Sequence, residues 1–217
     1  MLRLLLPKPK NSAYRVLCLG AHSDDIEIGC GGTILRLLEQ QKNTVVRWVV
    51  FSSSPARAEE ARQSADAFLS KAASREIVVK KFRDGFFPYT GGEVKDFFET
   101  LKPFAPDVIF THYRNDLHQD HRMLCELTWN TFRDHMVLEY EIPKFDGDLG
   151  SPNFFVELDD ATCHRKAQYL MENFKTQRDK HWFSEETFRA ILRVRGVECR
   201  ASTGYAEAFY ARKIVLG

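Results

Sequence analysis

The sequence predicts an α/β fold in which a mostly parallel sheet carries helices on both faces. Short apolar, β-branched segments alternate with longer amphipathic segments along the chain, which is the pattern of strands joined by crossover helices. Clusters of polar residues follow two of the apolar segments directly, at the place where such sheets bind ligands. A chain of 217 residues can bury a large core, and no linker divides it, so we expect a single domain over residues 1–217.

The same alternation predicts where the individual helices, strands and loops lie. The first helix is expected to open at Gly31-Gly32 and to end near Gln41. Ser54 and Pro55 predict a second helix start, because serine caps a first turn and proline suits the first helical position. Strands are expected near residues 15–19, 44–51, 77–79, 108–111, 136–142, 154–158 and 209–215, helices near 56–69, 94–101, 118–132, 161–174 and 184–192, and loops over 84–92 and 143–153.

The composition of the chain indicates which kinds of partner and which cellular environment to expect. Lys plus Arg total 31 and Asp plus Glu total 30, and this balance gives no support for a nucleic-acid or anionic-membrane partner. No apolar window is long enough to span a membrane or to act as a signal peptide. The five cysteines are odd in number and form no CxxC pair, which favours reduced thiols in a cytoplasmic protein. We therefore expect a small-molecule partner, and a homo-oligomer is compatible with the sequence.

The first polar cluster is His22-Ser-Asp24-Asp25, directly after the apolar run 16–21. Two adjacent carboxylates repel each other unless a cation holds them or one of them takes up a proton. A histidine beside them adds a nitrogen ligand. This arrangement predicts a metal site at the end of the first strand.

The second cluster, Asp116-Leu-His118-Gln-Asp120-His121, follows the fourth predicted strand in the same way. Alone, an HxxH pattern is compatible with a polar helix start. Together, the two clusters are expected at the same carboxyl edge of the sheet. Two histidines and one aspartate make an open zinc site, in which the pKa of a bound water falls to about 7. Other divalent metals are compatible with these ligands.

These motifs resemble those of a known family. Residues 21–34 resemble the AHPDDE…GG signature of the PIG-L/LmbE-like zinc deacetylases, and residues 118–121 resemble that family's HPDH motif. Segments similar to its RxxE, KxxAL…SQ and RG…AEAF motifs follow in order at residues 57–61, 166–177 and 195–209. The resemblance implies a Rossmann-like domain and zinc-dependent removal of an N-acetyl group from a glucosamine-type sugar or sugar conjugate.

The resemblance also implies roles for individual residues. His22, Asp25 and His121 match the metal ligands. Asp24 matches the general base that takes a proton from the zinc-bound water. A binding protein would not need such a base.

Three more positions follow from the same resemblance. His118 matches the residue that stabilises the oxyanion and protonates the leaving amine, and Asp120 would orient His118 and raise its pKa. Arg57 matches a substrate-binding arginine, although a solvated arginine at a helix start is an equal alternative. Ser23 and Gln119 replace the prolines usual in the two motifs, without removing a ligand or a base.

Two other functions stay open at this point. One is a zinc amidohydrolase acting on a non-sugar N-acyl substrate, and the other is a non-catalytic sugar-nucleotide-binding protein. Among residues near the motifs, we expect His112 to be a hydrogen-bonded structural residue and Glu27 to cap a helix or pair with a neighbour. The spacing of Gly31-Gly32 indicates close packing of a helix on the sheet rather than a phosphate-binding loop.

Overall fold

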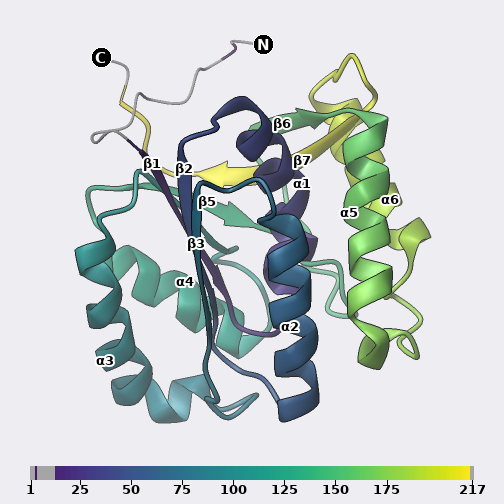
Figure 1. The fold of residues 1–217 in the computed structure, drawn as a ribbon. Helices are drawn as coiled ribbons and strands as arrows, with labels where there is room; N and C mark the ends of the chain where they lie inside the picture. Colours follow the sequence, from purple (N-terminus) through teal and green to yellow (C-terminus); the bar gives the residue numbers. More distant parts are fainter. Residues whose placement is uncertain (1–2, 4–12, 216–217) are drawn as a thin grey trace.

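In the computed structural model, which describes residues 3 and 13–215, seven strands form one sheet (Figure 1). Their order across the sheet is β3-β2-β1-β4-β5-β7-β6. The first five strands in this order, β3-β2-β1-β4-β5, pair in parallel, whereas β7 pairs antiparallel with both β5 and β6. This confirms the predicted α/β fold with a mostly parallel sheet. The strands are β1 (Tyr14–Gly20), β2 (Thr44–Val50), β3 (Ser74–Val79), β4 (Val108–His112), β5 (Met136–Tyr140), β6 (Phe154–Leu158) and β7 (Tyr205–Ala211).

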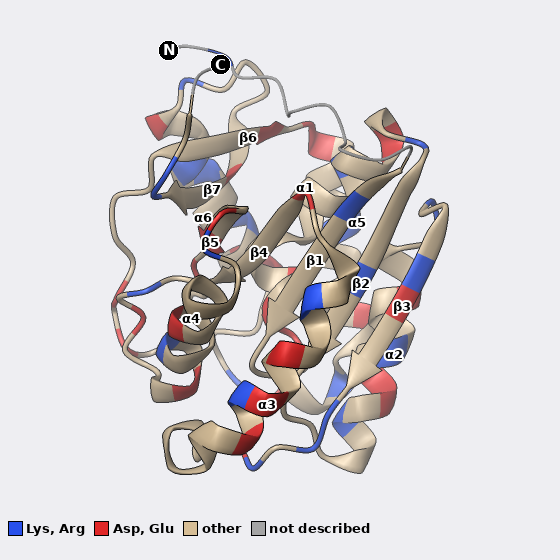
Figure 2. Ribbon diagram, turned by 90° about the vertical axis from the view of Figure 1, so that its left-hand side faces the viewer, with Lys and Arg blue, Asp and Glu red and all other residues tan. Residues whose placement is uncertain are grey.

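Helices cover both faces of the sheet (Figures 1 and 2). Helices α3 and α4 lie on one face, and α1, α2, α5 and α6 lie on the other. They are α1 (Asp25–Gln40), α2 (Pro55–Phe68), α3 (Gly91–Leu101), α4 (Gln119–Thr131), α5 (Asp160–Asn173) and α6 (Glu185–Glu198), with short 3₁₀ turns at Phe87–Thr90, Lys102–Phe104 and Lys175–Gln177. No helix in the described part of the chain is long and apolar enough to cross a membrane.

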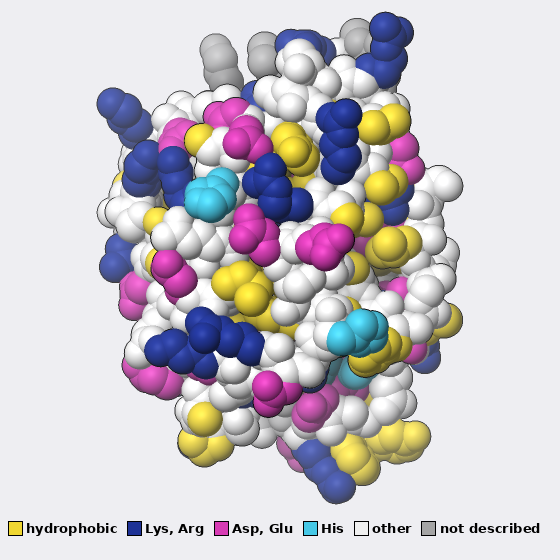
Figure 3. Space-filling model, turned by 90° about the vertical axis from the view of Figure 1, so that its right-hand side faces the viewer, with side chains coloured by type: hydrophobic (Ala, Val, Ile, Leu, Met, Phe, Trp, Pro, Cys, Tyr) yellow, Lys and Arg dark blue, Asp and Glu magenta, His cyan; other side chains and the backbone are white. Residues whose placement is uncertain are grey.

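The alternation of side chains along the strands divides the core in two. Leu17 and Leu19 of β1 belong to the cluster under α3 and α4, and the intervening Cys18 belongs to the cluster under α1, α2 and α5. Both clusters are buried, so the central strands are apolar on both faces, as parallel strands covered by helices must be. The outer surface differs: over α5 and α6, positive and negative side chains are interspersed (Figure 3).

Helix α1 begins six residues earlier than the sequence suggested, at Asp25 instead of Gly31. The glycines therefore lie inside the helix. A Cβ at Gly29 would lie 2.1 Å from Cδ2 of Tyr140 on β5, and one at Gly31 would lie 2.6 Å from Cε1 of Phe68. The expected close packing of this helix is thus confirmed, and the glycines permit it rather than start the helix.

A buried ion pair holds α1 in place behind the site. Nζ of Lys166 on α5 lies 2.6 Å from Oε1 of Glu207 on β7 and donates to the carbonyl of Ile28. The Glu207 carboxylate also accepts from the backbone N–H groups of Gly32 and Thr33, at 2.8 and 2.6 Å. These bonds connect α1 to α5 and to the antiparallel end of the sheet, so they fix the helix whose first turn carries the acidic motif.

Of the C-terminal elements, α6 is longer than expected and β7 is shifted four residues toward the N-terminus. Helix α6 continues to Glu198 instead of ending near residue 192, and β7 begins at Tyr205 instead of residue 209. The two elements pack closely, since a Cβ at Gly196 would lie 2.2 Å from the carbonyl oxygen of Gly204. Glycine inside α6 therefore reflects packing and does not mark the end of the helix.

Candidate metal centre

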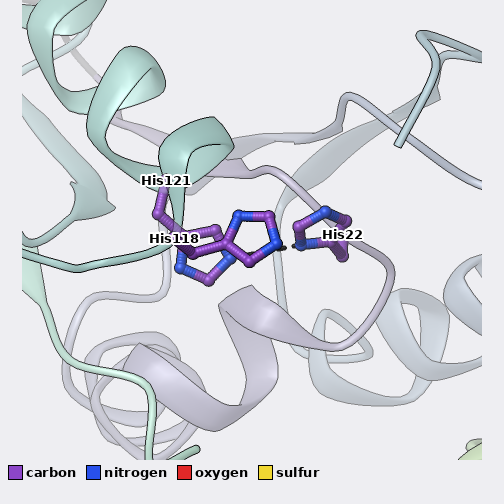
Figure 4. A group of neighbouring side chains, drawn as sticks. All are labelled: His22, His118 and His121. Carbon is purple, nitrogen blue, oxygen red and sulfur yellow. Dashed lines mark hydrogen bonds between the residues drawn. The ribbon is translucent and has the colours of Figure 1, made fainter. Parts of the chain in front are cut away.

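The two polar motifs meet because β1 and β4 are hydrogen-bonded neighbours in the sheet. His22 lies in the turn after β1, and Asp25 is the first residue of α1. His118 caps α4, and His121 lies in its first turn. The three histidine rings face one another across the gap between these turns (Figure 4). The predicted meeting of the two motifs at one edge of the sheet is confirmed.

Three ligand atoms form a compact triangle. Nδ1 of His22 lies 3.1 Å from Nε2 of His121 and 3.4 Å from Oδ2 of Asp25, and the latter two atoms are 3.5 Å apart. Tetrahedral zinc, with bonds of about 2.0–2.1 Å to nitrogen and oxygen, places neighbouring ligand atoms about 3.3–3.4 Å apart. The triangle therefore fits a small divalent cation without rearrangement.

The outer nitrogen of each of these histidines faces a carboxylate. Nε2 of His22 lies 2.9 Å from Oδ1 of Asp84, and Nδ1 of His121 lies 2.9 Å from Oδ2 of Asp116. An ionised carboxylate only accepts hydrogen bonds, so these contacts assign the ring protons to the outer nitrogens. The inner nitrogens then direct their lone pairs toward each other and toward Asp25. Carboxylates behind histidine ligands are typical of metal sites in proteins.

The charges of the cluster also favour a cation at this point. Burial would raise the pKa of Asp25, but His121 and His112 hold it well below its usual range. Burial lowers the pKa of His22, yet its hydrogen bonds to Asp120 and Asp25 raise it well above the usual value. Burial lowers the pKa of His121 to about 4, helped by His112. The cluster thus attracts positive charge between His22 and Asp25.

Asp24 lies outside the triangle and belongs to none of the groups of described residues that could hold a metal ion. Its side chain is buried, and Oδ1 accepts a hydrogen bond from Nη2 of Arg57 at 3.0 Å. Burial raises the pKa of Asp24, and the Arg57 guanidinium opposes this only in part. The two adjacent carboxylates are therefore distinct, with Asp25 held as an anion and Asp24 shifted toward the range of a general base.

Arg57 is positioned by the start of α2. Ser54 caps this helix by accepting from the Arg57 N–H, and Pro55 is its first residue, as predicted. The guanidinium reaches Asp24, and its Nε is buried without a hydrogen-bond partner among the described residues. A role in substrate binding stays a prediction.

His118 presents one nitrogen to the site. Its Nδ1 accepts from the Asp120 N–H at 3.3 Å, which leaves Nε2 for a ligand or substrate. Burial and the nearby His22 lower the pKa of His118, although the Asp120 charge raises it. The Asp120 charge thus raises the pKa of His118 as expected, but burial and His22 outweigh it. The Asp120 carboxylate instead accepts from the N–H groups of Gly85 and Phe87, at 2.7 and 3.1 Å, and so anchors the loop after β3.

Other nitrogen and oxygen atoms lie close enough to compete for a cation. Besides the triangle, the described residues include three further sets whose ligand atoms lie within 4.8 Å of one another: His22–His118–His121, Asp25–His112–His121 and His22–Asp84–Asp120. His112 is fully buried, stacks on His121, and its Nε2 accepts from the Ala21 N–H at 2.9 Å. The expected hydrogen bond of His112 is confirmed, and the same Nε2 also lies 3.2 Å from Oδ2 of Asp25.

The residues that replace the motif prolines make contacts that proline could not make. Ser23 Oγ lies 2.9 Å from Ser53 Oγ in the turn before α2, and the Gln119 side chain donates to the carbonyl of Gly85. Each contact connects a motif turn to a neighbouring loop. Glu27, in contrast, is fully buried and neither oxygen has a hydrogen-bond partner among the described residues, so its expected capping or pairing role is wrong.

Sequence reasoning missed the carboxylates behind the two histidines. Asp116 lies inside the second motif, five residues before His121, so its position gave a usable signal. Asp84 lies in a loop with no pattern that connects it to His22. Lys144, which contacts Asp116, lies in another loop and was equally hidden.

Comparison with known proteins agrees with this geometry. A family model described as PIG-L, GlcNAc-PI de-N-acetylase, matches residues 17–132, which include both motifs. N,N'-diacetylchitobiose deacetylase from Pyrococcus horikoshii is 20% identical with a TM-score of 0.67, covering 94% of this chain and 85% of that one. The zinc-inhibited form of teicoplanin deacetylase Orf2 is 17% identical with a TM-score of 0.68, covering 90% and 97%.

A third similar structure has a different activity. GalB, the 4-carboxy-2-hydroxymuconate hydratase from Pseudomonas putida KT2440, is 16% identical with a TM-score of 0.75 and covers 94% of this chain and 98% of that one. At such identities the structural similarity speaks for the fold alone. The family match extends over more than half of the 217 residues and spans the whole candidate metal centre. The chain therefore belongs to the PIG-L family.

Proposed function

We propose that the chain is a zinc-dependent N-deacetylase that acts on an N-acetylated glucosamine-type sugar or sugar conjugate. The observation that carries this proposal is the separation of tasks between two adjacent acids. Asp25 converges with His22 and His121 on one point, whereas the Asp24 carboxylate is free of that point and has a raised pKa. A site that only bound a ligand would not need the second acid.

His22, Asp25 and His121 would hold the cation. When bound, a divalent cation supplies Lewis-acid polarisation of a carbonyl and lowers the pKa of water. Asp24 accepts the proton of the water that attacks the amide carbon, and the bond from Arg57 keeps its carboxylate oriented. That proton balances the reaction, because the leaving nitrogen needs one to depart as an amine.

His118 stabilises the negative charge that develops on the carbonyl oxygen. Its Nδ1 accepts from the Asp120 N–H, so the proton of the neutral ring sits on Nε2 and is available to the developing oxyanion. The lowered pKa of His118 favours this neutral form at pH 7. The proton that the leaving nitrogen needs then comes from Asp24, because the neutral His118 ring can donate a hydrogen bond but would become an imidazolate if it gave up its only ring proton.

The sugar substrate is supported by the family description, which names GlcNAc-PI, and by the two similar deacetylases named above. The hydratase similarity supports a second candidate, addition of water to a carbon–carbon double bond by the same base and cation. An assay for acetate release separates the two reactions, because hydration releases no acetate.

The decisive experiment combines elemental analysis with an acetate-release assay on the full chain. The substrate panel contains N-acetylglucosamine, its β-linked disaccharide and simple acetamides. We expect one equivalent of zinc, and we expect turnover on the sugars to exceed turnover on simple acetamides. Equal rates on both would support a general amidohydrolase, and stoichiometric zinc without any acetate release would contradict the deacetylase proposal.

A further inference from the structure

Residues 141–150 follow β5 and overlap the surface loop that was expected over residues 143–153. Asp146 is exposed, but the other three charged side chains, those of Glu141, Lys144 and Asp148, are largely buried. We call this segment the strap. Within it, the Lys144 side chain is 10% exposed and that of Asp148 is 6% exposed. Both point toward the turn that begins α4, so the strap contacts the candidate metal centre from outside.

A single carboxylate connects the strap to both histidines of the second motif. Oδ2 of Asp116, which is 2% exposed, lies 2.9 Å from Nδ1 of His121 and 3.0 Å from Nζ of Lys144. Its Oδ1 accepts from the His118 N–H at 2.8 Å. Asp116 thus fixes the ring of one histidine and the backbone of the other, and Lys144 is its cation.

Lys144 also contacts two carboxylates of the strap itself, the exposed Asp146 at 3.9 Å and the buried Asp148. Its Nζ lies 2.5 Å from Oδ2 of Asp148, and this oxygen accepts from the Leu117 N–H at 2.7 Å. Lysine therefore lies between two buried acids on either side of the motif turn. Without it, the two carboxylates would share a low-dielectric pocket without a countercharge, which favours protonation or rotation of one of them.

The strap is itself held at its ends. Glu141 Oε1 accepts from the Gly150 N–H at 2.7 Å and from the Tyr210 hydroxyl at 2.6 Å. Arg195 Nη2 donates to Glu141 Oε2 at 2.6 Å and to the Gly150 carbonyl at 3.1 Å. The ends of the strap are thus joined, and a turn at Gly147, with φ of 65°, reverses the chain between them. The backbone that carries Lys144 is therefore held in place beside Asp116.

We propose that the strap is part of the metal centre and that Lys144 is a positioning residue, which holds Asp116 on Nδ1 of His121 and so presents Nε2 of His121 to a divalent cation. The inference rests on the proposed metal site. It assigns Lys144 no contact with the cation or the substrate. A strap that is merely structural would affect folding when changed, but it would leave the affinity of the folded chain for a cation unaltered.

The test measures zinc affinity of the full chain by titration in competition with a chromogenic chelator, with thermal melting to confirm folding. Removing a partner behind a histidine ligand typically weakens metal binding 10–100-fold. We expect K144M and D116N each to fall in this range, and K144R to retain most of the affinity because it keeps the cation. Lys81→Met is the matched control, since Lys81 is exposed and forms no ion pair with another described residue.

The combination of variants shows whether the lysine acts through Asp116. If it does, the double variant D116N/K144M binds zinc no more weakly than D116N alone, because the two changes remove one interaction. Additive losses, or a folded K144M with zinc affinity within twofold of the wild type, would overturn the inference. If K144M fails to fold, the ¹⁵N shifts of the His121 ring in D116A report the tautomer instead, and an unchanged Nδ1–H tautomer in D116A would overturn the inference, because alanine leaves no acceptor for that proton. A wild type that binds no zinc would instead reject the proposed function itself.

Discussion

Replacing Asp24 with asparagine separates catalysis from metal binding more cleanly than any other single change. The substitution keeps the shape of the side chain and an oxygen that can accept from Arg57 at the present 3.0 Å. It removes the ability to take up a proton. The triangle of His22, Asp25 and His121 does not include this carboxylate, so D24N is expected to retain zinc.

The structure sets the size of the expected loss. General-base assistance typically contributes 10²–10⁴-fold to a rate, which corresponds to about 2.7–5.4 kcal/mol of transition-state stabilisation. The cost in stability is smaller. D24N weakens one hydrogen bond between charged groups, worth about 1.5–3 kcal/mol, within a typical total of about 5–15 kcal/mol. We therefore expect a folded, zinc-loaded protein whose kcat is at least 100-fold lower.

The assay follows acetate release at saturating substrate, with zinc measured by elemental analysis on the same preparation. Asp96→Asn on the exposed side of α3 is the matched control and is expected to keep wild-type activity. A D24N protein with one zinc and kcat within tenfold of the wild type would refute the assignment of Asp24 as the base. Loss of zinc in D24N would show that this carboxylate is a ligand, against the geometry described here.

Three further changes test the ligands and the packing behind them. His121→Ala removes one corner of the triangle, so elemental analysis should find less than a tenth of an equivalent of zinc in a folded protein. Lys166→Met leaves the buried Glu207 without its cation, which typically costs about 3–5 kcal/mol of unfolding free energy. Calorimetry should therefore show Tm lowered by roughly 6–20 °C. The double variant that also carries Glu207→Gln should recover part of this loss. Gly29→Ala places a Cβ 2.1 Å from the Tyr140 ring, and urea unfolding should show a loss of about 1–3 kcal/mol or more; an unchanged midpoint would mean that α1 can move away from β5.

The sequence was sufficient to predict that the side chains of the triangle meet, because its members lie within a few residues of strand ends. His22 and Asp25 follow β1, and His121 lies in the first turn after the β4 loop. Parallel strands that end in polar clusters bring those clusters to one edge, whatever the details of the loops. Local order in the chain and the topology of the sheet together determine the position of these ligands.

The partners behind the ligands could not be predicted in the same way. Lys144 and Asp84 lie in loops, where neither period nor turn chemistry indicates which distant side chain a residue will contact. The way in which Asp120 contacts His118 could not be predicted for a related reason. Its backbone N–H, rather than its carboxylate, contacts His118, and a sequence pattern does not distinguish these two groups.

The division of labour between Asp24 and Asp25 follows from where α1 begins. Asp24 is the N-cap and Asp25 the first helical residue, and successive residues at a helix start point about 100° apart. One side chain therefore turns toward the histidines of the α4 turn, and the other turns toward Arg57 on α2. The early start of α1, which the glycines inside it make possible, is thus the structural reason that two identical neighbours acquire different protonation chemistry.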